Sequence, residues 1–244
     1  MNPRISVVTV SYNSEKTIEK TIQSVLSQTF TDFEYLIIDG GSTDSTIDII
    51  KSYEGAFGGR LKWVSESDNG IYDAFNKGVN LAKGHYVGFI NSDDWYELNA
   101  LELVNNEFYL DKDLYYGMLR VWQNNVEVKT YINHPENISK ESLAHPSVFI
   151  KKTVYESLGG YSLKYNSASD YDFFIRAISK GISTKSINRV IANFLRGGVS
   201  GTSLGYFETL NIKLKYGFIS KYLYLYMSKR KMIIDFLRFN NIIK

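Results

Sequence analysis

Short apolar runs alternate with amphipathic segments along residues 1–90. Four of the runs are rich in β-branched and aromatic residues and have the length of buried strands. Between them, apolar residues recur at helical spacing. The predicted strands are Ile5–Val10, Tyr35–Ile38, Leu61–Ser65 and Tyr86–Ile90, and the predicted helices are Glu15–Ser27, Ser45–Tyr53 and Gly70–Ala82. This alternation predicts βαβ units, and therefore an α/β fold in which helices cover both faces of a mostly parallel sheet.

The second half of the chain has a more mixed pattern. Its predicted strands are Leu114–Trp122, Val126–Tyr131, Ser147–Ile150 and Ser186–Phe194. The first two form a hairpin around Asn124-Asn125, and a helix over Ser169–Lys180 ends at Gly181. The sequence contains neither an internal repeat nor a linker-like segment. We therefore expect one domain over residues 1–205, followed by a helical tail over residues 206–244.

Polar clusters follow each of the first four predicted strands. They are Ser11–Asn13, Asp39, Ser67–Gly70 and Asn91–Asp94. The carboxyl ends of parallel strands meet at one edge of a sheet, and ligands of open α/β sheets bind there, so the clusters predict a binding site. Polar residues that simply end a strand would explain any single cluster. They explain four clusters in order poorly, since three of the four carry Asp.

The composition sets the broad class of protein. The 244 residues are 44% hydrophobic and 15% aromatic, which is enough for a packed core, and only three are proline. Cysteine is absent, which excludes disulfides, thiolate metal sites and cysteine nucleophiles and suits a reducing compartment. The first residues resemble neither a signal peptide nor a membrane span, and no run of about 18 apolar residues occurs. We therefore expect a cytoplasmic protein.

Positive charge is concentrated near the C-terminus. Residues 206–244 hold eight Lys or Arg against two acidic residues, a net charge of +6, so residues 1–205 carry −4 of the total +2. Aromatic residues are interleaved with these cations: Phe207, Tyr216, Phe218, Tyr222, Tyr224, Tyr226, Phe236 and Phe239. Such a tail suits peripheral contact with the inner face of a membrane. A helix pair packed on the domain or across a homodimer is the alternative, and no nucleic-acid-binding motif is present.

Five motifs follow one another along the chain: SVVTVSYN, IIDGGSTDST, SDNGIYDAFNKG, NSDD and ASDYDFFIRA. In this order they make the chain resemble the family 2 glycosyltransferases over about residues 4–200. The DNGIYDA block and the later RGGVS resemble the bacterial subgroup that builds O-antigen and capsular polysaccharide. The resemblance implies a GT-A fold, the Rossmann-like fold of nucleotide-diphospho-sugar transferases. It also implies inverting transfer from a nucleotide sugar, foremost a UDP-sugar, to a glycan or lipid-diphosphate-linked acceptor, with Mn²⁺ or Mg²⁺ as cofactor.

The family motif at the end of the fourth strand is Asp-x-Asp, and Asn91-Ser92-Asp93 matches it in part. A hard divalent cation bound by carboxylates neutralises a diphosphate leaving group. The resemblance therefore makes Asp93 the metal ligand, with Asp94 as a second carboxylate. Asn91 departs from the motif because a neutral amide adds no charge, and we expect it to contact the ribose or a metal-bound water. An Asp pair that only caps a loop is the alternative.

The resemblance also implies contacts with the nucleotide sugar at Thr9, Ser11, Tyr12, Asp39, Asp68, Asn76, Lys77, Asn91, Ser92 and Arg196. Asp39 would bind the base or ribose, Asp68 would bind the base, and Tyr12 would stack on it. Arg196 would pair with the diphosphate through its planar guanidinium. The structural alternatives are a turn for Asp39, a helix cap for Asp68, packing for Tyr12, and a solvated surface for Lys77 and Arg196.

The acceptor hydroxyl must lose its proton as it attacks, and a carboxylate at the start of a helix can accept that proton. The family has a Glu-Asp pair here with Asp as the general base, and this chain has Ser169-Asp170. We therefore expect Asp170 to be the base. Asp172 is the second candidate, and the two side chains point in different directions on a helix. A helix N-cap is the structural alternative for Asp170.

Other positions and other functions fit part of the pattern. His145 either contacts the donor or is structural, while Gly197 and Gly198 would let the backbone approach a ligand closely. A sugar-nucleotide nucleotidyltransferase would need a glycine-rich basic loop where this chain has Ser11–Asn13. A non-catalytic nucleotide- or glycan-binding module would bind the donor without turnover.

Overall fold

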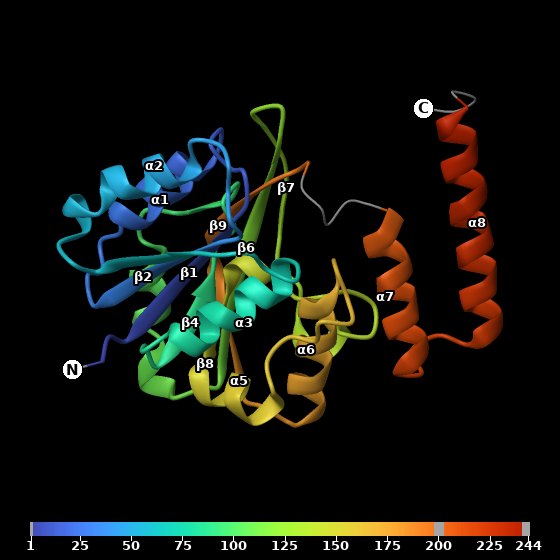
Figure 1. Cartoon of the computed structure of the whole chain (residues 1–244). Helices are drawn as coiled ribbons and strands as arrows, with labels where there is room; N and C mark the ends of the chain where they lie inside the picture. The colour runs from blue at the N-terminus through green and yellow to red at the C-terminus, as the bar shows by residue number, and fades with distance from the viewer. Residues whose placement is uncertain (1, 198–202, 241–244) are drawn as a thin grey trace.

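A nine-stranded sheet forms the centre of the protein (Figure 1). The computed structural model describes residues 2–197 and 203–240. The strands are β1 (Ile5–Ser11), β2 (Phe33–Asp39), β3 (Leu61–Ser65), β4 (Tyr86–Phe89), β5 (Trp95–Tyr96), β6 (Leu114–Gln123), β7 (Val126–Tyr131), β8 (Val148–Lys151) and β9 (Thr184–Leu195). Their order is β3-β2-β1-β4-β8-β6-β9-β5, and β7 pairs with β6. Strands β1 to β4 are parallel to one another, whereas β8 is antiparallel to both of its neighbours.

Helices cover both faces of this sheet. They are α1 (Ile18–Leu26), α2 (Thr46–Tyr53), α3 (Ile71–Leu81), α4 (Ala100–Asn105), α5 (Lys152–Leu158), α6 (Ser169–Ser179), α7 (Ser203–Lys215) and α8 (Lys221–Phe239). Figure 1 shows α1 and α2 on one side of β1 and β2, with α3, α5 and α6 on the other. The prediction of an α/β fold with helices on both faces is confirmed.

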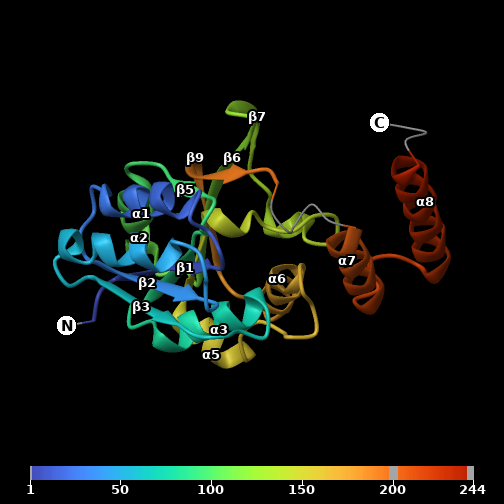
Figure 2. The ribbon, with the colours of Figure 1, turned by 45° about the horizontal axis from the view of Figure 1, so that its top comes forward.

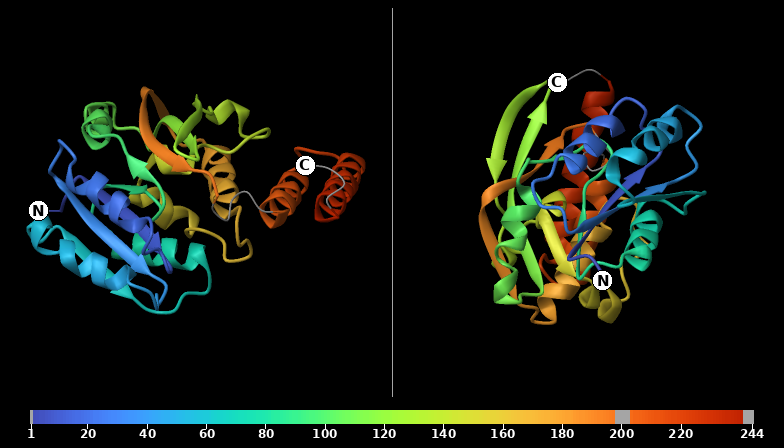
Figure 3. Two further views of the ribbon diagram at one scale, coloured as in Figure 1. Left: turned by 90° about the horizontal axis from the view of Figure 1, so that it is seen from above. Right: turned by 90° about the vertical axis from the view of Figure 1, so that its left-hand side faces the viewer.

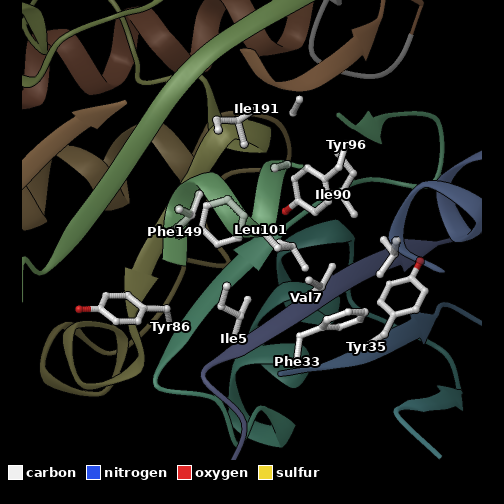
Figure 4. Packing of buried hydrophobic residues seen from close by; sticks show 14 of the residues in the cluster. Ile5, Val7, Phe33, Tyr35, Tyr86, Ile90, Tyr96, Leu101, Phe149 and Ile191 are labelled. Atoms are coloured by element: carbon white, nitrogen blue, oxygen red, sulfur yellow. The ribbon is translucent and has the colours of Figure 1, made fainter. Parts of the chain in front are cut away.

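Successive strand residues point to opposite faces, and two hydrophobic cores result. On β1, Val7 packs with residues of α1, α2 and α4, while Val8 packs with residues of α3, α5 and α6. The first core also contains Phe33, Tyr35 and Phe149, all nearly inaccessible to solvent (Figure 4). Every residue of β1 and β2 is buried, as expected for strands covered on both sides.

Several predicted boundaries shift. Helix α1 begins at Ile18 and not at Glu15, because Thr17 is the N-cap residue and the predicted cap Ser14 bonds elsewhere through its side chain. The predicted hairpin is present, and Asn124 and Asn125 both adopt positive φ angles at its turn. Strand β9 extends to Thr184–Leu195. The short elements β5, α4 and α5 were not predicted, since each has seven or fewer residues and gives little periodic signal.

The two C-terminal helices differ in how they contact the rest of the molecule. Helix α7 packs on α6, and its residues Glu208, Leu210 and Ile212 are buried. Helix α8 has no buried residue among those described and projects beside α7 (Figure 3). The division at residues 205 and 206 stays a prediction, and α7 is the part of the predicted tail that is packed into the body. Among the described residues, no helix combines the length and apolar character that crossing a membrane requires.

Two buried carboxylates hold α7 and α6 together. Glu208 of α7 accepts hydrogen bonds from the backbone N–H groups of residues 166, 167 and 168, at 2.8, 2.8 and 3.1 Å, immediately before α6. Asp172 of α6 accepts hydrogen bonds from Arg176 Nε and Lys215 Nζ at 2.9 Å and from the Tyr216 hydroxyl at 3.1 Å. Burial would raise the pKa of Asp172, but the bonds to Lys215 and Arg176 outweigh burial and lower it.

Replacing Glu208 by Gln should destabilise the protein by about 1–3 kcal/mol, because the three N–H groups lose a charged acceptor in a site where water cannot replace it. The free energy of unfolding from urea denaturation measures the effect. Glu156→Gln, at an exposed position of α5, is the matched control and should change stability by less than about 0.5 kcal/mol. Equal effects of the two substitutions would contradict this role of Glu208.

Candidate active site

The ends of β1, β2 and β3 are joined by the buried carboxylate of Asp39. Its Oδ1 accepts hydrogen bonds from the hydroxyls of Ser11 at 3.0 Å and Ser42 at 2.5 Å. Its Oδ2 accepts from the N–H groups of Gly41 at 3.0 Å and Ser42 at 2.8 Å and from the Ser65 hydroxyl at 2.8 Å. The predicted edge of polar strand ends is therefore present, with Ser11, Asp39 and Ser65 in register.

The loops after these strands are also bonded to one another. The Ser14 hydroxyl lies 2.8 Å from the Ser92 hydroxyl, which joins the loop after β1 to the loop after β4. Asn13, at a positive φ of 47°, donates its N–H to the Ser42 hydroxyl at 2.8 Å. Its side-chain oxygen accepts the N–H of Thr43 at 2.9 Å. The edge is consequently a connected surface and not a set of independent loop ends.

Some predicted donor-binding residues are occupied by contacts within the protein. Thr9 is buried, with its hydroxyl 2.9 Å from that of Tyr35. Ser11 and Asp39 bond to each other, and the five hydrogen bonds to Asp39 match the turn alternative. Tyr12, by contrast, is 65% exposed and free to pack against a planar ligand. The ligand contacts of these residues stay predictions.

Tyr12, Gly40 and Asp68 meet in one corner of the edge. A Cβ atom at Gly40 would lie 3.5 Å from the Tyr12 ring, an ordinary contact, and 3.1 Å from Asp68 Oδ2, so a side chain here would require a small shift of the Asp68 carboxylate. Gly70 is the N-cap residue of α3, which rules out the cap alternative for Asp68. Burial raises the pKa of Asp68 although Lys77 opposes the shift.

Asn76 and Lys77 on α3 make contacts within the protein. The Asn76 amide donates to the Tyr161 carbonyl at 2.9 Å and accepts the Tyr161 N–H at 2.8 Å, which ties α3 to the segment before α6. The Lys77 ammonium bonds to Asp68 and pairs with Glu66 at 2.8 Å. The alternative of a solvated surface lysine therefore does not describe Lys77, because ion pairs with Asp68 and Glu66 hold its ammonium group in place.

The NSDD segment divides into a buried and a more accessible carboxylate. Asp94 is fully buried and accepts the Leu195 N–H at 3.0 Å, which ties the end of β4 to the end of β9. Asp93 is only partly buried. Burial raises the pKa of Asp93, and burial together with the charge of Asp93 raises the pKa of Asp94 well above its usual value. The Asn91 side-chain oxygen is buried and has no hydrogen-bond partner within the described part of the chain.

A divalent cation fits these groups in part. An unpartnered amide oxygen and a carboxylate of raised pKa, two residues apart, are oxygen ligands of the kind that Mg²⁺ and Mn²⁺ accept. No group of three or more His, Cys, Asp or Glu that could hold a metal ion occurs within residues 2–197 and 203–240. Asp93 and Asn91 would therefore hold a cation only together with ligands from a bound molecule.

Asp170 lies in the first turn of α6 at the wall of a pocket. Ala168 is the N-cap residue and no side chain caps the helix, so the cap alternative for Asp170 is ruled out. Its Oδ1 accepts the Tyr72 hydroxyl at 3.0 Å. The pocket, of about 220 Å³, lies between α6, α7 and residues 140–142, and Thr209 and Lys213 of α7 also line it. A larger pocket of about 690 Å³ surrounds Arg4 and His85, and none of the predicted site residues lines it.

The other candidate base, Asp172, is not available. Its carboxylate is 2% exposed and is already bonded to Arg176, Lys215 and Tyr216. Of the two acidic residues that begin α6, only Asp170 lines the pocket. Figure 2 shows α6 between the sheet and α7. The residues that line the pocket come from three segments of the chain, 140–142, 167–171 and 209–213.

An aromatic layer connects Asp170 to the end of β4, and the sequence analysis missed it. The ring of Tyr72 packs on Phe75, which packs on Phe89, with centroids 5.5 and 4.6 Å apart. His145 stacks on Phe89, and its Nε2 lies 2.9 Å from the Tyr161 hydroxyl. Burial lowers the pKa of His145 and so favours the neutral imidazole. Of the two roles considered for this residue, donor contact and a structural role, the packing favours the structural one. The sequence signal for this layer was the helical spacing of the aromatic residues Tyr72 and Phe75 in IYDAF.

Arg196 lies at the end of β9 on the exposed surface. Its guanidinium donates to the Gln123 side chain at 3.3 Å, and its backbone N–H donates to the Trp122 carbonyl at 2.9 Å. The structure describes Gly197, which has a positive φ of 136°, whereas Gly198 lies outside the described residues. The role of this loop toward a diphosphate stays a prediction.

Comparison with known proteins identifies the family. The model of "Glycosyl transferase family 2" matches residues 6–182. A "PGL/p-HBAD biosynthesis glycosyltransferase" of Mycobacterium bovis is 31% identical over 205 residues, which cover 82% of this chain and 80% of that protein. Chondroitin synthase of Escherichia coli is 29% identical over 239 residues, or 91% of this chain but only 34% of the longer protein.

Solved structures show the same fold at low identity. Staphylococcus aureus TarS 1–349 in complex with UDP-GlcNAc has a TM-score of 0.70 at 20% identity, covering 87% of this chain and 65% of that one. The mannosyltransferase PcManGT from Pyrobaculum calidifontis, in complex with GDP-Man and Mn²⁺, has a TM-score of 0.63 at 17% identity and covers 87% of this chain and 61% of its own. The predicted GT-A fold is confirmed. The chain belongs to glycosyl transferase family 2 and is a glycosyltransferase.

Proposed function

We propose that this enzyme transfers a sugar, with inversion, from a nucleotide-diphosphate donor to a hydroxyl of a glycan or lipid-linked acceptor in bacterial surface polysaccharide synthesis. The observation that carries the proposal is the pocket position of Asp170, whose neighbour Asp172 is occupied by three protein partners. The names of the bacterial relatives support polysaccharide or glycolipid synthesis as the setting. The UDP-GlcNAc complex of TarS supports a UDP-sugar as the donor.

In the proposed reaction, the acceptor hydroxyl lies in the pocket with its proton directed at Asp170. Its oxygen forms a bond to the anomeric carbon as the bond from that carbon to the donor phosphate breaks. The electron pair of the broken bond leaves with the nucleotide diphosphate, and the hydroxyl proton passes to the Asp170 carboxylate. The Tyr72 hydroxyl, 3.0 Å from Asp170 Oδ1, orients that carboxylate.

The donor binds along the polar edge in this proposal. Tyr12 and Asp68 meet the base, and the diphosphate lies near Asn91, Ser92 and Asp93. A cation held by Asp93 and the Asn91 oxygen would neutralise charge on the departing diphosphate. Asp94, bonded to the Leu195 N–H, holds this segment in place. A nucleotidyltransferase is less well supported, because the loop after β1 is not a glycine-rich basic loop. A binding module would show donor binding without turnover, which the activity measurement below distinguishes.

Asp170→Asn should lower transfer by about 10²- to 10⁴-fold, because the amide accepts the Tyr72 hydrogen bond but cannot take up the proton. Release of nucleotide diphosphate is scored with a panel of nucleotide sugars and acceptors, and donor binding is measured by calorimetry. Binding should stay within about twofold of wild type. Asp48→Asn, at an exposed site on α2, is the control and should retain full activity. Undiminished transfer by Asp170→Asn would refute the proposed base.

Asp93→Asn should weaken Mn²⁺ binding by at least about tenfold when UDP is present, since a charged oxygen ligand is lost. The free Mn²⁺ signal in electron paramagnetic resonance measures binding. Wild-type protein should bind Mn²⁺ weakly without UDP, because Asp93 and Asn91 supply too few ligands alone. The Asp48→Asn variant should match wild type. Tight Mn²⁺ binding without nucleotide, or binding by Asp93→Asn equal to wild type, would contradict the proposed site.

A further inference from the structure

Helix α8 presents a large apolar and basic surface that nothing in the described structure covers. Its exposed apolar residues are Tyr222 at 87%, Phe239 at 87%, Phe236 and Tyr226 at 64%, Met232 at 61%, Ile233 at 59%, Leu225 at 45% and Leu223 at 43%. Such a concentration on one helix is far above the scattered exposed apolar residues of an ordinary surface. Figures 1 and 3 show this helix standing beside α7 and away from the sheet.

The inner face of α8 is already used for contact with α7. Tyr224 donates its hydroxyl to the Asn211 side chain at 2.8 Å. Asp235 pairs with Lys231 on the same helix and accepts the Ser203 hydroxyl at 2.8 Å. Residues 224, 231 and 235 are seven and four positions apart and therefore share one face. The helix is thus fixed to α7 in one rotation, which turns its remaining faces outward.

The outer face has a regular spacing. Tyr222, Tyr226, Lys229, Ile233 and Phe236 follow one another at steps of four, three, four and three residues. Residues with this spacing form one stripe along a helix. The stripe is apolar except at Lys229, which lies in its middle, and Arg230 lies beside it. Both cations are exposed, and neither forms an ion pair with any residue in ranges 2–197 and 203–240.

Either a second copy of the chain or a lipid bilayer could cover this stripe, and the charge of α8 distinguishes between them. Helix α8 carries five Lys or Arg against Asp235, a net charge of +4. Two copies packed along the stripe would bring equal charges together and bury Lys229 without a partner, which costs free energy. A bilayer with anionic headgroups accepts the aromatic and aliphatic side chains at its interface and attracts the cations. The long stem of Lys229 lets its ammonium reach the headgroups while the neighbouring side chains insert.

We propose that the outer face of α8 docks the enzyme on an anionic lipid surface. Helix α7 links this face to the candidate active site, since Thr209 and Lys213 line the Asp170 pocket from α7 while Asn211 contacts α8. Docking through α8 would hold that pocket close to the lipid headgroups, within reach of an acceptor anchored in the membrane. The binding itself does not depend on the proposed transfer reaction and is tested without substrates.

Flotation of the full chain tests this proposal. Wild-type protein should float with vesicles of equal parts phosphatidylglycerol and phosphatidylcholine, and much less with phosphatidylcholine alone. The double variant Lys229→Glu/Arg230→Glu should lower the partition coefficient by at least about tenfold, as should Phe236→Ser/Phe239→Ser. Matched controls on the body, Lys180→Glu/Arg189→Glu for charge and Leu98→Ser/Tyr109→Ser for exposed apolar area, should float as wild type does.

Equal flotation of wild type and the α8 variants would overturn the proposal, as would an equal loss in the body controls. Sedimentation of the protein without vesicles tests the alternative, in which a second copy of the chain covers the outer face of α8. A monomer supports lipid docking, whereas a dimer that Phe236→Ser/Phe239→Ser dissociates would assign the face to a second copy. Circular dichroism verifies that every variant keeps its helices, which is expected because the substituted side chains are exposed.

Discussion

The buried carboxylate of Asp39 is the interaction on which the candidate site depends. A buried carboxylate without access to water needs a full set of hydrogen-bond donors, and Asp39, at the end of β2, accepts five hydrogen bonds from the ends of β1 and β3 and from the turn that follows it. Satisfying this one group therefore fixes where β1, β2 and β3 end relative to one another. The loops that leave those ends, and through Ser14 and Ser92 the loop after β4, take their positions from it.

This arrangement separates residues that shape the site from residues that face open space. Hydrogen bonds within the protein occupy the polar groups of the first kind, which are Thr9, Ser11, Asp39, Asn76 and Asp94. The same framework leaves other side chains more accessible, among them Tyr12, Asp93 and Asp170. Residues of both kinds belong to the same motifs, so a motif marks the region of the site without distinguishing its frame from its contact surface.

The sequence predicted much of the fold, because the first half of the chain repeats strongly periodic strands and helices. Periodicity does not show which of two Asp residues on one helix already forms hydrogen bonds and ion pairs within the protein. Asp172 differs from Asp170 because it bonds to Arg176 on the same helix and to Lys215 and Tyr216, which lie more than 40 positions further on. The tertiary cap that Glu208 provides for α6 was equally hidden, since no local pattern links residues 40 positions apart. Short elements such as β5 and α5 depend on tertiary contacts that single-sequence patterns do not contain.

The cap by Glu208 also has a consequence for the order in which the enzyme matures on the ribosome. A nascent chain folds from its N-terminus, and the ends of β1, β2 and β3 that bond to Asp39 have emerged long before β9, whose end bonds to Asp94. The segment that carries Asp170 must wait for α7, whose Glu208 satisfies the N–H groups before α6 and whose last residue, Lys215, neutralises Asp172. The strand ends around Asp39 can therefore assemble first, whereas the segment that carries Asp170 obtains its contacts only after nearly the whole chain has been synthesised.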